Sequence, residues 1–238
     1  MSNIALIIAG GRGNRMGQDL PKQFLNIQDK PIIMYTCEAF QKHPLIDSIV
    51  IVCINGWQTA LQAYANQFNI TKLRAIVPGG KNGQASIYNG ISAIAENGNS
   101  DDIVLVHDAI RPLVSQEIIT KCIRTTEEFG SAVTCVPCAE ALLETRDQET
   151  SGQVLDRDQV KRTQTPQGFS LGTLLKMHEE ARRHGITDSV ASCTLAVELG
   201  MTVHFCPGSE KNIKLTTVDD IDIFKALLES KQAKWLKR

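Results

Sequence analysis

The sequence of 238 residues contains no apolar run close to the about 18–20 residues that a membrane-spanning helix needs. The apolar run near the start, residues 4–11, has only eight residues and lacks a basic leader, so it predicts neither an anchor nor a signal peptide. There is also no excess of positive charge, since 25 Lys and Arg face 26 Asp and Glu and the formal net charge is −1. We therefore expect a globular protein with no membrane and no nucleic-acid partner.

The sequence shows no disulfide framework either. Its seven cysteines are an odd number, and they are scattered through mostly apolar segments, whereas disulfide-stabilised domains are short and dense in paired cysteines. Cys135 and Cys138 have the CxxC spacing, but they follow a strand-like stretch, while redox pairs usually open a helix. We interpret the cysteines as core residues of a cytoplasmic protein, with redox chemistry at the CxxC pair as the alternative.

Strand-like and helix-like segments alternate along nearly the whole chain. Continuous apolar runs, which are typical of buried parallel strands, cover residues 4–8, 48–54, 73–77, 103–106, 132–136 and 201–205. Helical patterns cover residues 32–41, 57–67, 85–96, 115–129, 171–183, 189–199 and 219–228. This order predicts an α/β fold, a Rossmann-like and mostly parallel sheet with helices on both faces. No linker divides the chain, so we expect a single domain over residues 1–238.

A glycine-rich loop directly follows the first predicted strand, where ligands bind in such sheets. Its glycines would let the main chain approach a polyphosphate closely and offer it N–H donors. The dinucleotide motif GxGxxG fails because its third glycine would fall on Met16, and no Gly-Lys-Ser/Thr follows to make a P-loop. The order GG-x-G-x-R-M and then Pro-Lys instead resembles the signature of sugar-nucleotide-type nucleotidyltransferases.

Further motifs narrow this resemblance. The chain is similar to the cytidylyltransferases that act on polyol phosphates, over roughly residues 4–224. The segments that carry the likeness are Pro21-Lys-Gln-Phe24, His107-Asp-Ala-Ile-Arg-Pro112, Gln164-Thr-Pro-Gln-Gly-Phe169, Thr187-Asp188 and Asn212-Ile-Lys-Leu-Thr216.

The resemblance implies that a substrate phosphate attacks the α-phosphorus of CTP, giving a CDP-polyol and pyrophosphate. A phosphate monoester has its second pKa near 6 and is mostly dianionic at neutral pH. Such a nucleophile requires no general base. The protein must instead neutralise a crowded anionic transition state with fixed cations and a metal ion, for which we expect Mg²⁺.

Each expected role comes from matching this sequence to the family motifs. Arg15 and Lys22 would be the catalytic pair that stabilises the phosphates. Asp108 would hold Mg²⁺ or the ribose, although a carboxylate after a strand can also simply cap a tight turn. The nucleotide-binding residues would be Ala9, Gly10, Gly11 and Gly13 at the triphosphate, Gly80 and Ser86 at the cytosine, and Asp108 with Ala109. We interpret His107 as a structural hydrogen-bonding residue.

Residues 138–160 interrupt the alternation with an acidic, weakly periodic stretch. Its composition alone favours a solvated surface excursion. The resemblance instead implies a protruding arm that is exchanged across a homodimer. The arm would bring Arg157 into the partner's site, where it would bind the polyol phosphate together with Lys214.

The identity of the polyol phosphate is the least determined feature. Family members usually carry an Arg at the position of Gly83, and a hydroxyl residue at the position of Ala141. The spacing after Asp188 is longer than in 2-C-methyl-D-erythritol 4-phosphate cytidylyltransferases and looks more like the ribitol-5-phosphate branch. We favour ribitol 5-phosphate. The alternatives are methylerythritol phosphate and, from another functional class, a non-catalytic CTP-binding regulator.

Overall fold

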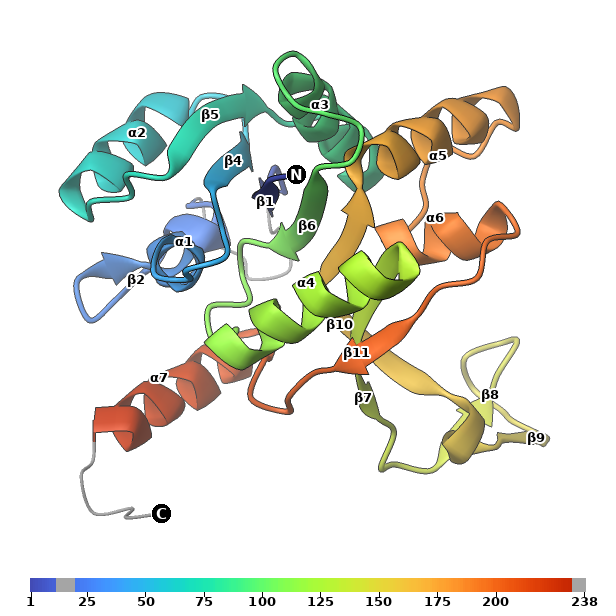
Figure 1. The fold of residues 1–238 in the computed structure, drawn as a ribbon. Helices are drawn as coiled ribbons and strands as arrows, with labels where there is room; N and C mark the ends of the chain where they lie inside the picture. The colour runs from blue at the N-terminus through green and yellow to red at the C-terminus, as the bar shows by residue number, and fades with distance from the viewer. Residues whose placement is uncertain (12–19, 233–238) are drawn as a thin grey trace.

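The computed structural model describes residues 1–11 and 20–232. Within these residues seven strands form one central sheet, in the order β11-β7-β10-β6-β1-β4-β5 (Figure 1). The strands are β1 (Asn3–Ala9), β4 (Ser48–Cys53), β5 (Leu73–Pro78), β6 (Ile103–Asp108), β7 (Ser131–Pro137), β10 (Lys161–Ser170) and β11 (Phe205–Pro207).

The sheet is mostly parallel. β1 pairs in parallel with both β4 and β6, β4 with β5, and β7 with β11. The exception is β10, which lies between β6 and β7 and runs antiparallel to both. The order places β1 between β4 and β6, so its carboxyl end opens between the ends of these two strands. Side chains that follow these three strands therefore meet at one edge of the sheet.

Helices cover both faces of the sheet, as the alternating pattern predicts. One face packs on α1 (Ile32–Gln41), α2 (Gln58–Gln67) and α4 (Gln116–Phe129), and the other on α3 (Gly83–Ala95), α5 (Leu171–Arg183) and α6 (Ser192–Glu198). Successive residues of β1 divide between the two cores, with Ala5 and Ile7 in the first and Ile4 and Leu6 in the second. Because β1 is buried on both faces, it reads as a continuous apolar run.

Local signals set several helix ends. In α4 the Ser115 hydroxyl accepts a hydrogen bond from the amide of Ile118 at 3.2 Å, which caps the first turn. The helix ends at Gly130, whose φ of +77° is the left-handed conformation that glycine adopts without strain. In α3 the Asn82 side chain accepts from the amide of Ala85 and caps the helix in the same way.

A third apolar cluster closes one corner of the molecule. It joins α7 (Val218–Gln232) to α1 and to the short strand β2 (Asn26–Ile27), which pairs with β3 (Lys30–Pro31). Phe224 and Leu215 pack there with Ile110, a residue just beyond β6. This cluster holds the segment before α7 against the end of β6. No helix in the described part of the chain is long and apolar enough to cross a membrane.

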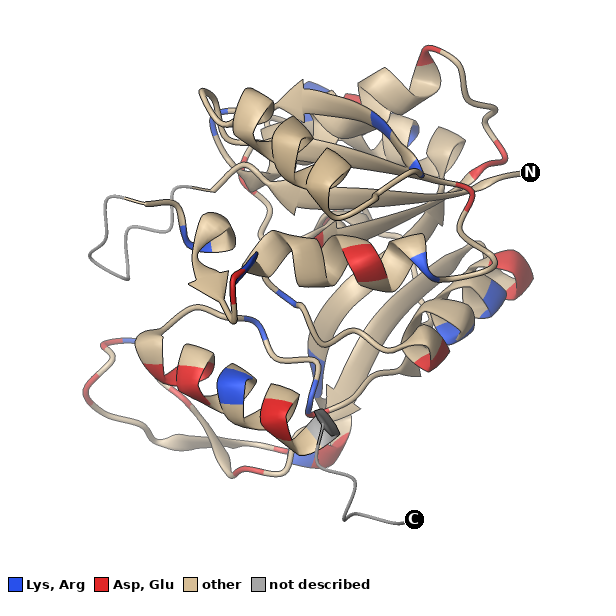
Figure 2. Cartoon of the chain, turned by 90° about the vertical axis from the view of Figure 1, so that its left-hand side faces the viewer, with Lys and Arg blue, Asp and Glu red and all other residues tan. Residues whose placement is uncertain are grey.

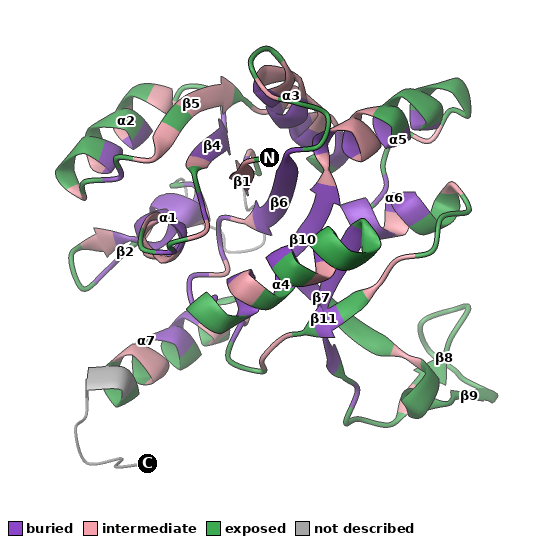
Figure 3. Ribbon diagram, in the orientation of Figure 1, coloured by how far each residue is buried: buried purple, intermediate pink, exposed green. Residues whose placement is uncertain are grey.

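The segment between β7 and β10 extends away from the sheet. It contains the antiparallel hairpin of β8 (Leu142–Glu144) and β9 (Gln153–Leu155), followed by the 3-10 helix η3 (Arg157–Gln159). Figure 1 shows the hairpin projecting from the body, and Figure 3 shows it exposed almost throughout. Leu143 and Val154 are 61% and 75% exposed. These two residues are cross-strand partners in the hairpin, so they form one exposed apolar pair.

Some expected elements differ from the structure. The strand expected at residues 201–205 is wrong over most of its length, because residues 201–204 form no strand and β11 begins at Phe205. The sequence pattern predicts no element for the motif at residues 164–169, yet the motif lies inside β10. The helix expected from residue 189 begins only at Ser192. All seven cysteines lie in the described ranges and are buried with free thiols, as expected for core residues.

Candidate nucleotide and phosphate site

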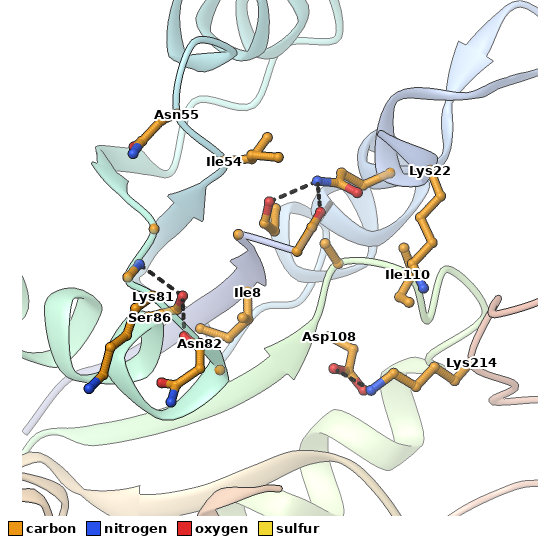
Figure 4. A pocket seen from close by; sticks show the side chains of 18 residues that line it. Ile8, Lys22, Ile54, Asn55, Lys81, Asn82, Ser86, Asp108, Ile110 and Lys214 are labelled. Carbon is orange, nitrogen blue, oxygen red and sulfur yellow. Dashed lines mark hydrogen bonds and ion pairs between the residues drawn. The ribbon is translucent and has the colours of Figure 1, made fainter. Parts of the chain in front are cut away.

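A cavity with a volume of about 690 Å³ lies at the carboxyl ends of β1, β4 and β6 (Figure 4). This is the place that the strand order predicts. The cavity is bordered by the start of α3 and by the segment before α7. Its lining contains these residues predicted from the sequence: Ala9, Gly10, Gly11, Lys22, Gly80, Ser86, Asp108, Ala109 and Lys214.

Two glycine segments form one wall of the cavity, and their main chains are very close. A Cβ atom placed on Gly79 would lie 3.2 Å from the Cα of Gly10. One placed on Gly10 would lie 3.0 Å from the hydroxyl oxygen of Ser86, and one on Gly80 would lie 2.5 Å from the Cβ of Ala85. Larger residues would therefore push the two segments apart. Gly83 differs, because a Cβ there would meet nothing within 4 Å.

Hydrogen bonds fix the shape of the second segment. The Gly80 amide donates to the Ser86 hydroxyl at 3.0 Å, and that hydroxyl donates to the Asn82 carbonyl at 2.8 Å. Ser86 is thus held by the loop itself, with its side chain 3% exposed in this structure. The wall offers main-chain polar groups and little side-chain bulk, which suits a flat base or a phosphate chain.

Gln23 fastens the first glycine segment. Its side-chain amide donates to the carbonyls of Ala9 at 2.8 Å and Gly11 at 3.0 Å, and the residue is 2% exposed. The two bonds hold the chain where it leaves β1. Gln23 belongs to the Pro21–Phe24 motif, but the motif predicts no role for it. A single glutamine after the glycine-rich loop gives no signal of its partners in the sequence alone.

A cluster of charges forms the opposite wall. The Asp108 carboxylate accepts from Lys214 Nζ at 3.1 Å and from Arg111 Nε at 3.0 Å, and the dashed line in Figure 4 marks the first contact. Burial alone would raise the pKa of Asp108, but the positive charges of Lys214 and Arg111 outweigh it and lower the pKa below its usual value. Asp108 is therefore ionised, and the cluster carries a net positive charge.

Hydrogen bonds between the segment after β6 and the segment before α7 hold Arg111 and Lys214 in place. Arg111 Nη1 donates to the Asn212 carbonyl at 2.7 Å, and the Leu215 amide donates to the Ile110 carbonyl at 2.9 Å. Lys214 remains 43% exposed at its side chain, so its ammonium group can turn toward a ligand in the cavity. Arg111 belongs to the His107–Pro112 motif, which by itself predicts no role for it. The structure brings it into the cluster.

Two side chains from β10 and the segment before α7 support this wall. The Asp108 amide donates to the Thr165 hydroxyl at 3.0 Å, and the fully buried Asn212 side chain donates to the Thr165 carbonyl at 2.9 Å. Thr165 and Asn212 lie in motifs that carry the resemblance, yet their contacts join residues 57 and 47 positions apart. Only the placement of β10 beside β6 makes the contacts possible.

His107 lies behind the charge cluster. It is fully buried, and its Nε2 lies 3.2 Å from the Arg111 carbonyl, to which the ring donates. Burial lowers the pKa of His107 to about 4, so the ring is neutral near pH 7. This geometry agrees with the structural role expected from the sequence, since a neutral buried ring facing a carbonyl is poorly placed to exchange protons with a ligand.

The carboxylate of Asp108 can serve as one ligand of a divalent cation. Mg²⁺ in phosphoryl-transfer sites is commonly held by one or two carboxylates together with substrate phosphates and water. Within residues 1–11 and 20–232, no group of three or more His, Cys, Asp or Glu side chains forms a complete metal cage. The donor set therefore fits a cation that arrives with a phosphate ligand and does not fit one held by protein side chains alone.

Three predicted residues are not placed in this cavity. Arg15 and Gly13 lie outside the described residues. Arg157 lies in η3 beside the projecting hairpin, where its Nη1 donates to the Ala139 carbonyl at 3.0 Å. It does not line the described cavity. Figure 2 shows acidic and basic residues distributed over many elements and not gathered on one broad basic surface.

The fold and the cavity define the chain as a nucleotidyltransferase-like α/β protein, with a main-chain wall facing a cationic wall at the ends of the central strands. Residues 3–230 match the family described as 2-C-methyl-D-erythritol 4-phosphate cytidylyltransferase (IspD). The chain belongs to this family.

Individual relatives cover nearly the whole chain. A ribitol-5-phosphate cytidylyltransferase of Lacticaseibacillus paracasei is 40% identical over 96% of this chain and 98% of its own. A 2-C-methyl-D-erythritol 4-phosphate cytidylyltransferase of Clostridium botulinum is 35% identical over 95% of this chain and 97% of its own. The crystal structure of the corresponding enzyme of Thermus thermophilus superposes with a TM-score of 0.77, at 27% identity, and the match covers 96% and 100% of the two chains.

Proposed function

We propose that this protein is a cytidylyltransferase that converts CTP and ribitol 5-phosphate into CDP-ribitol and pyrophosphate. The observation that carries the proposal is one cavity with a glycine wall on one side and the Asp108–Arg111–Lys214 cluster on the other, in a chain of this family. Ribitol is favoured over methylerythritol because the ribitol-phosphate relative is more similar, at 40% against 35% identity. The long spacing after Asp188 agrees with this choice, whereas Ala141 departs from both branches and favours neither.

The reaction is a direct displacement. An oxygen of the ribitol phosphate forms a bond to the α-phosphorus of CTP, and the bond from that phosphorus to the bridging β-oxygen breaks. The electron pair leaves with pyrophosphate, and no proton is abstracted, since the attacking phosphate is already dianionic. The protein contributes position and charge.

Each wall has its own task in this proposal. The glycine wall formed by Gly10, Gly11 and Gly80 holds the nucleotide through its main chain. Lys22, with Arg15, neutralises the charge that develops on the triphosphate. Lys214 binds the incoming phosphate, and Asp108 keeps the Lys214 ammonium group at the cavity before substrate arrives. Ala109 and Ser86 complete the nucleotide side.

Mg²⁺ would be held by Asp108 together with oxygens of the CTP phosphates. When bound, it would add positive charge that screens the phosphates from one another. The chain's own residues then position the two anions and exclude water between them. We place the protein in the cytoplasm, in keeping with its CTP substrate and its seven free thiols.

The active form is proposed to be a homodimer in which residues 138–160 form an arm that reaches the partner's cavity. Two observations support this. The arm exposes Leu143 and Val154 to solvent, and Arg157 lies on the arm away from the cavity of its own chain. In the dimer, Arg157 of one chain would join Lys214 of the other at the ribitol phosphate.

Mixing two inactive variants tests this arrangement. Arg157→Gln and Lys214→Met homodimers would each have two damaged sites, whereas a mixed dimer would have one site with both residues intact. After random exchange of subunits we expect about a quarter of wild-type activity to return. A mixture that stays as inactive as its components, although mass analysis shows mixed dimers, would contradict arm exchange.

Pyrophosphate release is the direct test of the activity. Purified protein is incubated with CTP, Mg²⁺ and, separately, ribitol 5-phosphate, methylerythritol 4-phosphate and other alditol phosphates. Release with ribitol 5-phosphate at the highest kcat/KM is the expected result. Tight CTP binding by calorimetry without release from any member of the panel would instead identify a CTP-binding regulator.

A further inference from the structure

The start of α3 is tied to a segment about 100 residues further along the chain. The Gln84 side chain donates to the Ile186 carbonyl at 2.8 Å and accepts from the Ser189 amide at 2.9 Å. The Asn82 side chain donates to the Thr187 carbonyl at 2.7 Å. We call these three hydrogen bonds the loop contact.

The loop contact is buried at its centre. Gln84 is 7% exposed and Ser189 is 8% exposed, so water competes little for their bonds. Because the NH2 group and the carbonyl oxygen of the Gln84 side chain are both hydrogen-bonded, the position and the orientation of the side chain are fixed. The segment that receives these bonds is itself held, because the Ile186 amide donates to the Ala181 carbonyl at the end of α5 and the Ser189 hydroxyl donates to Glu198 in α6.

A continuous chain of hydrogen bonds leads from this segment to the cavity. Asn82 is bound to Thr187 through its side chain, and its carbonyl accepts from the Ser86 hydroxyl. The Ser86 hydroxyl in turn accepts from the Gly80 amide. Gly80, Asn82 and Ser86 line the cavity, whereas Gln84, Ile186 and Ser189 do not. A shift at residues 186–189 would therefore move the nucleotide wall without any direct contact to a ligand.

We infer that Gln84 is a positioning residue for the nucleotide: through the loop contact it holds the Gly80–Ser86 wall in the conformation that binds the base and ribose of CTP. The inference rests on the proposed function for the identity of the ligand. It adds that affinity for CTP depends on a segment outside the cavity. Binding of the polyol phosphate, which involves the opposite wall, should be insensitive to it.

Gln84→Leu removes both hydrogen bonds of Gln84 while nearly keeping its volume. We expect the Kd for CTP to rise about tenfold, since each buried hydrogen bond contributes modestly and two are lost. The KM for the polyol phosphate should stay within about twofold of wild type at saturating CTP. Hydrogen exchange at the amides of Gly80 and Ser86 should become faster even when no ligand is present.

Gln41 offers a matched control. It also bridges two segments with both ends of its amide, donating to the Thr71 hydroxyl at 2.8 Å and accepting from the Lys72 amide at 2.9 Å, but it does not line the cavity. Gln41→Leu should leave the Kd for CTP and the exchange of Gly80 and Ser86 unchanged. Asn82→Ser is the second test variant, because serine can still cap α3 but is too short to reach Thr187.

Each outcome decides the inference. A folded Gln84→Leu protein with unchanged CTP affinity and unchanged exchange would overturn it, and if that variant does not fold, Asn82→Ser is judged by the same two readouts. If Gln41→Leu changes both readouts as much as Gln84→Leu, the effect is general destabilisation and the inference is wrong. If wild-type protein binds no CTP, the proposed function fails, while exchange in the ligand-free variants still reports whether the loop contact holds the wall.

Discussion

Gly80 is the position in the nucleotide wall where one added methyl group should matter most. A Cβ atom on Gly80 would lie 2.5 Å from the Cβ of Ala85, 2.6 Å from the carbonyl carbon of Ala85 and 2.8 Å from the Ser86 amide nitrogen. These distances are well inside van der Waals contact, and two of the three atoms belong to the main chain. The methyl group of Gly80→Ala can therefore be accommodated only if the wall moves.

The size of the effect follows from this clash. Forcing an extra methyl group into a packed region typically costs about 1–3 kcal/mol. In the free protein the wall can relax by moving away from Ala85, but CTP binding requires the original position, so the strain reappears on binding. We therefore expect CTP affinity to fall by a factor of about 5–150, with 1.4 kcal/mol corresponding to tenfold.

Gly83→Ala is the matched control, because Gly83 lines the same cavity and its added Cβ would meet nothing within 4 Å. Gly83 is also the first residue of α3, where alanine is at least as favourable as glycine. Calorimetry should give wild-type CTP affinity for Gly83→Ala, and thermal unfolding should show an equal or slightly higher Tm. Equal CTP affinities for the Gly80→Ala variant and the wild type would refute the reasoning, as would equal losses in both variants.

Three further predictions concern the opposite wall and the buried histidines. Lys214→Met should raise the KM for the polyol phosphate about 10–100-fold, because it removes a charge-assisted contact. Lys211→Met should leave this KM unchanged. Steady-state kinetics of both variants would show whether the positive charge acts at position 214. Burial lowers the pKa of both His107 and His178 to about 4, so the unfolded chain binds more protons between about pH 6.5 and 4. The free energy of unfolding should thus fall as the pH falls, by up to about 1.4 kcal/mol per pH unit and histidine. Urea titrations near pH 7 and pH 5 measure this change in the free energy of unfolding, and the change should be smaller in the His178→Gln variant. A free energy of unfolding that is the same at both pH values would contradict the prediction. Removing divalent cations with a chelator should stop pyrophosphate release until Mg²⁺ is returned. The Asp108→Asn variant should need a higher Mg²⁺ concentration for half-maximal release. If that concentration is the same as for the wild type, Asp108 is not part of the metal site.

Much of the layer structure could be predicted from the sequence because each element carries its own pattern. The run of residues 4–8 is apolar throughout since β1 is buried on both faces. Ser115 caps the start of α4 and Gly130 ends the helix, and both signals lie in the local sequence. β10 was missed because its residues 161–170 combine polar side chains with proline and glycine and match no simple strand pattern. The expected strand at residues 201–205 was shifted, since pairing with β7 and not side-chain pattern decides where β11 begins.

The sequence by itself determined the chemistry available to this protein: glycines after the first strand, cations at fixed offsets, and a carboxylate at the end of β6. These are local features, since residues a few positions apart on a strand end or loop stay together in any fold that forms the strand. Only the tertiary structure decided that Arg111, Asn212 and Thr165 meet around Asp108, and that Gln84 reaches Ser189. Those contacts join segments up to about 100 residues apart, and they depend on β10 lying between β6 and β7 and on how α3 packs beside α5, which no short stretch of sequence specifies.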